Sequence, residues 1–232
     1  MTCVALIPAA GSGSRVAGAQ PKQYAALAGK PMLWHAVAAV CRAPVETVFV
    51  VLAPGDTAYG SCDWSAFAGR LEPLYCGGET RRDSVYNGLV AAMAAVQADD
   101  WVLVHDAARP CLPAADLERL VAECRDDQIG GILASPVAET VKRAGKDEAG
   151  AQRIAGTEDR AQLWLAQTPQ MFRAGLLADA LRKAPPTVTD ESSAVEALGL
   201  RPRLVLGSRE NLKVTYLEDL ALAEAILARR AS

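Results

Sequence analysis

The feature that most constrains the fold of this chain is a repeated alternation of short apolar runs with longer amphipathic segments. Continuous apolar runs are typical of strands buried on both faces of a sheet, and the segments between them have the periodicity of helices. The predicted strands cover residues 3–7, 47–52, 71–75, 101–104 and 131–135, and the predicted helices cover residues 32–41, 84–96, 116–125 and 216–230. This order predicts an α/β fold with a mostly parallel sheet flanked by helices and a ligand site beyond the carboxyl ends of the strands.

The pattern changes between residues 137 and 159, where charged, small and turn-forming residues replace the apolar runs. Two short extended pieces, residues 140–142 and 153–155, flank a turn-like stretch at residues 146–150. This predicts a β-hairpin that projects from the domain, and residues 137–159 are called the arm below. The alternative is a flexible surface loop. The rest of the chain has the size of one α/β domain, so we expect a single domain over residues 1–232 that carries the arm.

Composition excludes several classes of partner. The net charge of −3 argues against a nucleic-acid backbone, because proteins that bind one present a basic excess. The six cysteines form no C-x-x-C pair and the chain has only two histidines, which excludes the usual structural zinc motifs. The first residues have the features of neither a signal peptide nor a membrane segment. We therefore expect a cytoplasmic protein with reduced cysteines that binds neither nucleic acid nor a membrane.

A glycine-rich loop, P-A-A-G-S-G-S-R at residues 8–15, follows the first predicted strand. Glycines at this position let main-chain N–H groups approach a polyphosphate, and Arg15 and Lys22 supply neutralising charge nearby. The spacing does not fit a P-loop, and it does not fit G-x-G-x-x-G because Val16 takes the place of the third glycine. The loop therefore indicates a phosphate site of another kind, with an ordinary turn as the alternative.

The segment V-H-D-A-A-R-P, residues 104–110, lies where a central strand is expected to end. Asp106 in such a place is suited to a hard divalent ion that also touches substrate phosphates, which is how Mg²⁺ is usually bound. The alternative for Asp106 is a helix cap or turn residue. Arg109 is suited to a bidentate phosphate contact, with a surface ion pair as the alternative. His105 is expected to be packed or hydrogen-bonded rather than to bind a metal.

Two further motifs carry polar side chains next to predicted strands. The paired glycines Gly77 and Gly78 lie between a strand and a helix, where they permit close approach of the backbone to a flat ligand. Ser84 offers a hydroxyl group to the base of such a ligand, and the alternative is an ordinary turn with a helix cap. Lys213 stands beside another predicted strand, and by itself it is equally typical of a solvated surface.

Taken in order, seven motifs of the chain resemble those of the 2-C-methyl-D-erythritol 4-phosphate cytidylyltransferases of bacterial isoprenoid synthesis. They are P-A-A-G-x-G-x-R, P-K-Q-Y, G-G-x-x-R-x-x-S-V, V-H-D-A-A-R-P, D-R-x-x-L-W, T-D-E and N-x-K-V-T. Each motif alone is weak, but their common order and similar gaps are specific, and the resemblance extends from Val4 to about Leu227. It implies a Rossmann-like nucleotidyltransferase fold and a homodimer formed through the arm.

The resemblance also implies an activity and a set of site residues. The activity is transfer of the CMP moiety of CTP to 2-C-methyl-D-erythritol 4-phosphate, with Mg²⁺ as cofactor, in the non-mevalonate (MEP) isoprenoid precursor pathway. The residues expected to bind the nucleotide are Ala9, Ala10, Gly11, Gly78, Glu79, Ser84 and Ala107. The residues expected to act in catalysis are Arg15, Lys22 and Lys213. Asp106 is expected to hold the metal, and the expected acceptor site comprises Asp106, Arg109, Thr140 and Thr189 together with Arg160 of the partner subunit.

Such a reaction needs no Ser-His-Asp group, because the attacking phosphate oxygen is already ionised, and positioning and electrostatics are expected to dominate. Three alternatives remain open from the residues. A ribitol 5-phosphate cytidylyltransferase shares the chemistry and much of the motif set. An NAD-binding oxidoreductase is opposed by the missing third glycine. A non-catalytic nucleotide-binding regulator is opposed by the joint presence of Lys22, Asp106 and Lys213.

Overall fold

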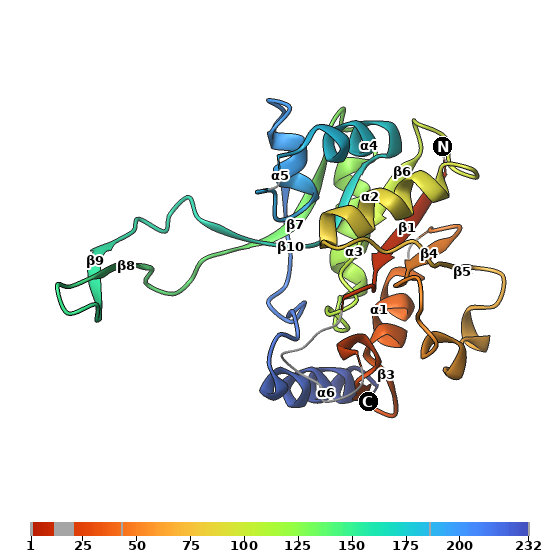
Figure 1. The fold of residues 1–232 in the computed structure, drawn as a ribbon, viewed down its shortest axis with the longest axis horizontal. Helices are drawn as coiled ribbons and strands as arrows, with labels where there is room; N and C mark the ends of the chain where they lie inside the picture. The colour runs from red at the N-terminus through yellow and green to blue at the C-terminus, as the bar shows by residue number, and fades with distance from the viewer. Residues whose placement is uncertain (1, 12–20, 43, 186, 232) are drawn as a thin grey trace.

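The computed structural model describes residues 2–11, 21–42, 44–185 and 187–231, and it contains a seven-stranded sheet with helices on both faces (Figure 1). The strand order is β11-β7-β10-β6-β1-β4-β5. The strands are β1 (Cys3–Pro8), β4 (Val48–Val51), β5 (Leu71–Leu74), β6 (Trp101–Val104), β7 (Gly130–Pro136), β10 (Trp164–Arg173) and β11 (Arg203–Leu206). All neighbouring pairs are parallel except those of β10, which runs antiparallel to β6 and β7. The predicted α/β fold with a mostly parallel sheet is confirmed.

Alternate side chains of the strands enter two separate cores, as the period of a strand requires. In β1, Ala5 and Ile7 pack against α1 (Met32–Val40) and α3 (Ala114–Cys124). Val4 and Leu6 belong to the other core, which is covered by α2 (Arg81–Ala92), α4 (Ala174–Lys183) and α5 (Glu191–Glu196). The last helix, α6 (Leu217–Ala231), covers a third, smaller cluster that includes Met32 and Cys111. No helix in the described part of the chain is long and apolar enough to cross a membrane.

The shorter elements surround the sheet. Single turns of 3₁₀ helix lie at η1 (Lys22–Tyr24), η2 (Tyr59–Ser61) and η3 (Ser65–Phe67), and β2 (Ala26–Leu27) pairs with β3 (Lys30–Pro31) in a small hairpin. The predicted strands and helices agree with the observed ones apart from their ends. The largest differences are in α2, which ends at Ala92 instead of Val96 and begins at Arg81 instead of Ser84; it begins earlier because the Thr80 side chain accepts a hydrogen bond from Asp83 N at 3.1 Å and caps the helix.

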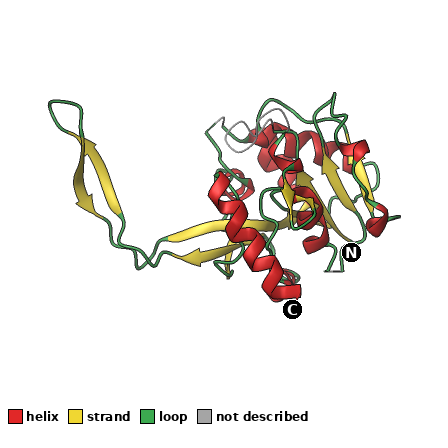
Figure 2. Cartoon of the chain, turned by 90° about the horizontal axis from the view of Figure 1, so that it is seen from below, coloured by secondary structure: helices red, strands yellow, loops and turns green. Residues whose placement is uncertain are grey.

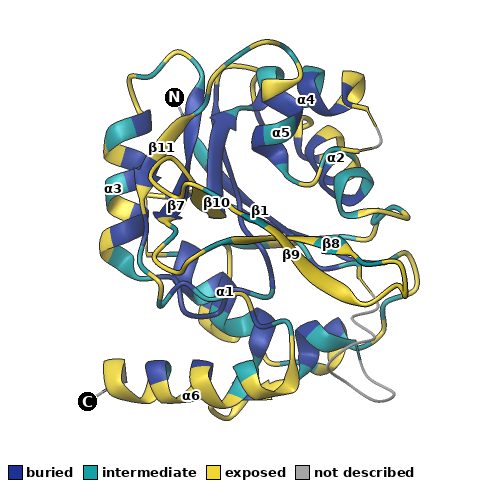
Figure 3. Ribbon diagram, turned by 90° about the vertical axis from the view of Figure 1, so that its left-hand side faces the viewer, coloured by how far each residue is buried: buried dark blue, intermediate teal, exposed yellow. Residues whose placement is uncertain are grey.

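The arm extends away from the body of the molecule (Figures 1 and 2). Its hairpin consists of β8 (Lys142–Lys146) and β9 (Gln152–Thr157), which pair with each other in a separate two-stranded sheet. Strand β9 extends beyond the predicted piece at both ends, whereas β8 shares only Lys142 with the piece predicted at residues 140–142. Figure 3 shows most of the hairpin as exposed, and the apolar side chain of Ile154 is 69% accessible to solvent. The hairpin itself is therefore observed, whereas its role in dimerisation stays a prediction.

Candidate functional site

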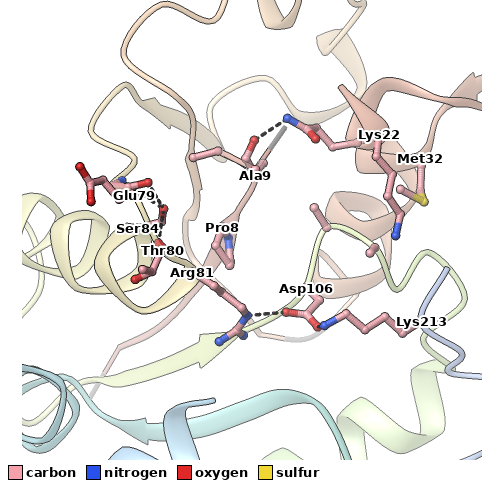
Figure 4. Close-up of a pocket in the computed structure, with 16 residues that line it drawn as sticks. Pro8, Ala9, Lys22, Met32, Glu79, Thr80, Arg81, Ser84, Asp106 and Lys213 are labelled. Atoms are coloured by element: carbon pink, nitrogen blue, oxygen red, sulfur yellow. Dashed lines mark hydrogen bonds and ion pairs between the residues drawn. The ribbon is translucent and has the colours of Figure 1, made fainter. Parts of the chain in front are cut away.

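A cavity of about 500 Å³ opens beyond the carboxyl ends of the central strands (Figure 4). The loops after β1, β5 and β6 form much of its wall, as expected for a parallel sheet. All of the residues predicted to bind a nucleotide line it, namely Ala9, Ala10, Gly11, Gly78, Glu79, Ser84 and Ala107. Lys22, Asp106 and Lys213 line the same cavity. The structure thus brings together residues that are up to about two hundred positions apart in the chain.

The paired glycines allow the loops after β1 and β5 to touch. A Cβ atom at Gly77 would lie 2.2 Å from the Ala10 Cβ, and one at Gly78 would lie 2.5 Å from the Asp83 Cβ. A larger residue at position 77 would therefore push the loops after β1 and β5 apart, and one at position 78 would press on the first turn of α2. The Ser84 hydroxyl accepts a hydrogen bond from Gly78 N at 3.1 Å and donates to Thr80 O at 3.0 Å, so it fixes the shape of this loop.

Hydrogen bonds of the P-K-Q-Y segment, residues 21–24, stabilise the opposite wall of the cavity (Figure 4). Gln23 Nε2 donates to the carbonyl oxygen of Ala9 at 2.6 Å, which anchors the segment to the loop after β1. The Tyr24 hydroxyl donates to Asp56 Oδ2 at 2.7 Å. Lys22 Nζ donates to the carbonyl oxygen of Val214, so this lysine side chain reaches from η1 to the loop that carries Lys213.

Asp106 lies at the centre of a cluster of cations. Arg81 Nε is 2.9 Å from its Oδ1, while Lys213 Nζ is 2.8 Å and Arg109 Nε 3.8 Å from its Oδ2. Burial alone would raise the pKa of the Asp106 carboxyl, but Arg81 and Lys213 outweigh it and hold the pKa well below its usual value. Arg81 also forks to the buried Glu191, with Nη–Oε distances of 2.6 and 3.0 Å. The carboxylate is therefore ionised and held in one orientation by its neighbours.

This arrangement does not fit a metal ion bound directly by Asp106. Both carboxylate oxygens already face cationic nitrogens within 2.9 Å. Glu79, the other acidic side chain of the cavity, lies on a different wall from Asp106 (Figure 4). No group of three or more potential ligands is found among the residues that the structure describes. The assignment of Asp106 as a metal ligand stays a prediction, and no chemical step below depends on it.

His105 and Thr168 hold the main chain of the Asp106 turn from beneath. The His105 Nε2 lies 3.0 Å from the carbonyl oxygen of Arg109, and its Nδ1 lies 3.1 Å from Thr168 Oγ1. Thr168 Oγ1 accepts from Asp106 N at 3.0 Å, so its own proton is available for His105 Nδ1. This network requires the neutral imidazole with its proton on Nε2. Complete burial lowers the pKa of His105 to about 4, which keeps the ring neutral at physiological pH.

We expect the protein to lose stability as the pH falls from 6.5 towards 4. In this window the unfolded chain binds a proton at His105 and the native chain does not, which corresponds to roughly 3 kcal/mol across the interval. Denaturant titrations at several pH values should show a shallower loss for His105→Gln than for the wild type. The matched control is His35→Gln, which removes a half-buried histidine outside the network and should keep most of the loss. An NMR titration of the His105 ring near 6.5 would contradict this account.

A smaller cavity of about 80 Å³ adjoins the cation cluster. Its wall contains Arg109 and Thr189, which were predicted to bind an acceptor, together with Asp106 and Lys213. Thr189 precedes α5, whose start is fixed by a capping box between Asp190 and Ser193. Thr140 and Arg160 lie outside both cavities, on or next to the arm. Both are exposed, and Arg160 Nη1 donates to the carbonyl oxygen of Ala138. Arg15 lies outside the described residues.

Several site residues had no role in the sequence-based prediction. Arg81, Glu191 and Asn211 are the arginine, glutamate and asparagine of the G-G-x-x-R-x-x-S-V, T-D-E and N-x-K-V-T motifs, so their membership of a motif was the available signal. Gln167 and Thr168 lie within β10, where they gave no such signal. The interactions of these residues join segments that are distant in sequence, such as Arg81 and Glu191, which are 110 positions apart.

Comparisons with known proteins agree with these motifs. A family model described as 2-C-methyl-D-erythritol 4-phosphate cytidylyltransferase matches residues 3–229. A protein of that name from Nitrosomonas eutropha is 56% identical over 231 residues, covering 98% of this chain and 97% of its own length. Another from Dechloromonas aromatica is 56% identical, with 97% of each chain covered. A crystal structure of 4-diphosphocytidyl-2C-methyl-D-erythritol synthase has 41% identity and a TM-score of 0.84, covering 97% of this chain and 98% of that one.

Proposed function

The chain belongs to the 2-C-methyl-D-erythritol 4-phosphate cytidylyltransferase family, and we propose that it transfers CMP from CTP to 2-C-methyl-D-erythritol 4-phosphate. The products are 4-diphosphocytidyl-2-C-methyl-D-erythritol and pyrophosphate, in the MEP pathway. The observation that carries this proposal is that one cavity holds the whole predicted nucleotide set beside Lys22, Asp106 and Lys213. Membership of the family favours this transfer over the oxidoreductase and regulator alternatives.

The proposed reaction is an in-line displacement at the α-phosphorus of CTP. An oxygen of the acceptor phosphate donates an electron pair and forms a new bond to phosphorus. The bond between this phosphorus and the oxygen that bridges to the β-phosphate breaks, and pyrophosphate leaves with the electron pair of that bond. No general base is needed, because the attacking oxygen is ionised at neutral pH. The main barrier is the meeting of two anions, which fixed cations lower by stabilising the developing charge.

The cations of the site approach this reaction from two sides. Lys22 enters the cavity from η1, where it is suited to the triphosphate and to the leaving pyrophosphate. Lys213 lines both the large and the small cavities, where the two phosphates would meet, and Arg109 lines the small one beside it. Asp106 holds Lys213 at 2.8 Å, so it orients this cation before the substrates arrive. Arg15 keeps its predicted role as a further triphosphate contact.

We further propose that Mg²⁺ enters together with the triphosphate. This ion retains water and is commonly bound through substrate phosphates, and when bound it would neutralise phosphate charge. Asp106 does not offer it an open carboxylate oxygen, because both of its oxygens already face cations. The protein's own contribution to the reaction therefore comes from its cations.

A labelling experiment tests the bond that breaks. With CTP labelled on the α-phosphate, the label should appear in the cytidylated product, whereas a label on the γ-phosphate should appear in pyrophosphate. Release of the α-label as inorganic phosphate would contradict CMP transfer.

We place the activity in the cytoplasm, and this proposal is supported by the six cysteines, all of which are free thiols.

We propose that two subunits share each acceptor site through the arm. The arm lies apart from the body, and it carries exposed apolar side chains such as Ile154. Thr140 and Arg160 face neither of the two cavities of their own chain. An arm that clasps a second copy would bury this apolar surface and carry these polar residues towards the partner's acceptor.

In this arrangement, Arg160→Ala is expected to raise the KM for the acceptor by about 10-fold or more, since a charged hydrogen bond to phosphate is lost. The KM for CTP should change much less. Steady-state kinetics with each substrate varied in turn measure both values. The matched control is Arg153→Ala, an exposed arginine of the neighbouring β8–β9 hairpin that is paired with Asp147 at 2.8 Å. Equal effects of Arg160→Ala on both substrates would count against the shared site.

Mixed dimers sharpen this test. A dimer of one Lys22→Ala chain and one Arg160→Ala chain contains one site with both residues intact, if the site is shared. Turnover at low acceptor concentration should therefore recover on mixing the two variants. No recovery in dimers of proven mixed composition would contradict the proposal.

A further inference from the structure

Asn211 is a fully buried polar residue in the loop that follows β11. Its Nδ2 group donates to Gln167 Oε1 at 3.1 Å and to the carbonyl oxygen of Thr168 at 2.8 Å. Both acceptors belong to β10, which lies two strands away from β11 in the sheet. The side chain of Asn211 therefore ties its loop to the strand segment beneath the cation cluster.

The main chain around Asn211 holds the cations themselves. The carbonyl oxygen of Asn211 accepts from Arg109 Nη1 at 2.6 Å. Two residues further on, Lys213 reaches Asp106, and the next residue, Val214, donates its N–H to the carbonyl oxygen of Ala108 at 2.8 Å. The position of this short loop thus sets where Arg109 and Lys213 stand relative to each other.

The hydrogen bonds of the Asn211 side chain require an amide in one orientation. The two Nδ2 protons face oxygen acceptors, so a reversed amide or a carboxylate would place oxygen against the oxygen of Thr168. Asn211 Oδ1 is buried and has no hydrogen-bond partner among the described residues, so one polar atom is left unpaired while both donors are used. Gln167 is oriented in turn, because its Nε2 donates to the carbonyl oxygen of Ser208 at 3.0 Å.

We propose that Asn211 is a positioning residue that sets the separation of Arg109 and Lys213 through its bonds to Gln167 and Thr168. The effect on turnover rests on the proposed function, because these cations are assigned to the meeting phosphates. The positioning role itself does not rest on that function, because it concerns only the loop around Asn211 and its contacts.

Two variants test the proposal. Asn211→Ala removes the donor group and keeps the main-chain oxygen that Arg109 uses. Gly207→Ala leaves Asn211 intact, but its Cβ would lie 2.6 Å from Gln167 Oε1, so the end of this side chain must shift. This shift breaks one of the bonds of Asn211. The matched control is Asp100→Asn, which weakens a buried polar contact with Thr2 N and Gln97 N at the far end of β6.

Asn211→Ala is expected to lower kcat by about 10-fold or more and to raise the acceptor KM, since small misplacements of charge slow such reactions strongly. Gly207→Ala should act in the same direction with a smaller effect, and neither should raise the KM for CTP as much. The Asp100→Asn control should lower thermal stability without lowering kcat or raising the acceptor KM in this way. Wild-type kcat and acceptor KM in a folded Asn211→Ala protein would overturn the proposal. If that variant does not fold, unchanged kinetics in Gly207→Ala would do so.

Amide hydrogen exchange of Val214 in the absence of substrates separates this inference from the proposed function. Both variants should speed exchange at Val214, whose N–H is bonded to Ala108, and Asp100→Asn should not. Unchanged protection in both variants would overturn the positioning role even if the enzyme is active. Loss of protection in the variants, together with a wild-type protein that is inactive on the proposed acceptor, would support the positioning role and refute the proposed function instead.

Discussion

Lys22→Ala is expected to lower the rate of pyrophosphate release by about 100-fold or more, because a preorganised cation is removed from the reacting triphosphate. Lys22 lines the cavity and reaches the loop of Lys213 through the carbonyl oxygen of Val214. Its contribution to folding is expected to be small by comparison, since a hydrogen bond such as the one to Val214 is worth about 1 kcal/mol. The melting temperature should therefore change little while turnover nearly disappears.

A coupled assay of pyrophosphate release, with both substrates near saturation, measures this loss. The matched control is Lys30→Ala, which removes a lysine of β3 that is paired with Asp63 at 3.7 Å. This variant should keep turnover close to the wild-type value. A Lys22→Ala enzyme with near-normal turnover would remove Lys22 from the proposed mechanism.

Asp106→Asn is expected to lower kcat by about 100-fold while leaving the affinity for CTP unchanged or higher. The substitution removes the carboxylate that holds Arg81 at 2.9 Å and Lys213 at 2.8 Å, so both cations lose their fixed positions. It also makes the cavity more positive by one charge, which favours anion binding in the ground state. A fall in kcat without a rise in the CTP KM is the expected signature.

The same variant should be less stable, because Lys213 loses its anion and Arg81 keeps only Glu191, at a cost below that of a fully uncompensated buried pair, which is about 3–5 kcal/mol. Calorimetric CTP binding and the kinetics are therefore measured on the folded fraction. Asp127→Asn is the control, since Asp127 accepts hydrogen bonds from Ile129 N and Gly130 N away from the cavity. An Asp106→Asn enzyme that binds CTP much more weakly would contradict the orienting role and favour direct participation in nucleotide binding.

The sequence predicted the structure best where the properties of neighbouring residues alone determine it. The apolar runs predicted five strands of the sheet, and the motifs that follow them form one cavity because parallel strands end on the same edge. The start of α2 was misplaced by three residues because the capping role of Thr80, four residues before Ser84, was not recognised.

Strand β10 shows why the remaining part of the sheet could not be predicted from the sequence. It is the antiparallel strand of the sheet, and its buried part contains Gln167, Thr168 and Gln170 in place of a continuous apolar run. These polar side chains are satisfied by partners far away in sequence, such as Asn211 and Asp190. Hydrophobic periodicity does not reveal such a strand, because its pattern follows the site that it supports.

The cation cluster is a second such case. Asp106, Arg109 and Lys213 were singled out from the sequence, but their pairing with one another was not. Arg81 and Glu191 can pair only when α2 and α5 meet beside β6 in the folded protein. Ion pairs between elements that are distant in the chain depend on the tertiary fold, and no local spacing rule specifies them.

The most direct test of the central claim is an acceptor panel with CTP and Mg²⁺. Pyrophosphate release is measured with 2-C-methyl-D-erythritol 4-phosphate, with ribitol 5-phosphate and with no acceptor, and the cytidylated product is identified by phosphorus NMR. We expect release to depend on an acceptor and kcat/KM to be highest for 2-C-methyl-D-erythritol 4-phosphate. Equal or faster turnover of ribitol 5-phosphate, or no turnover with either acceptor, would contradict the proposed function.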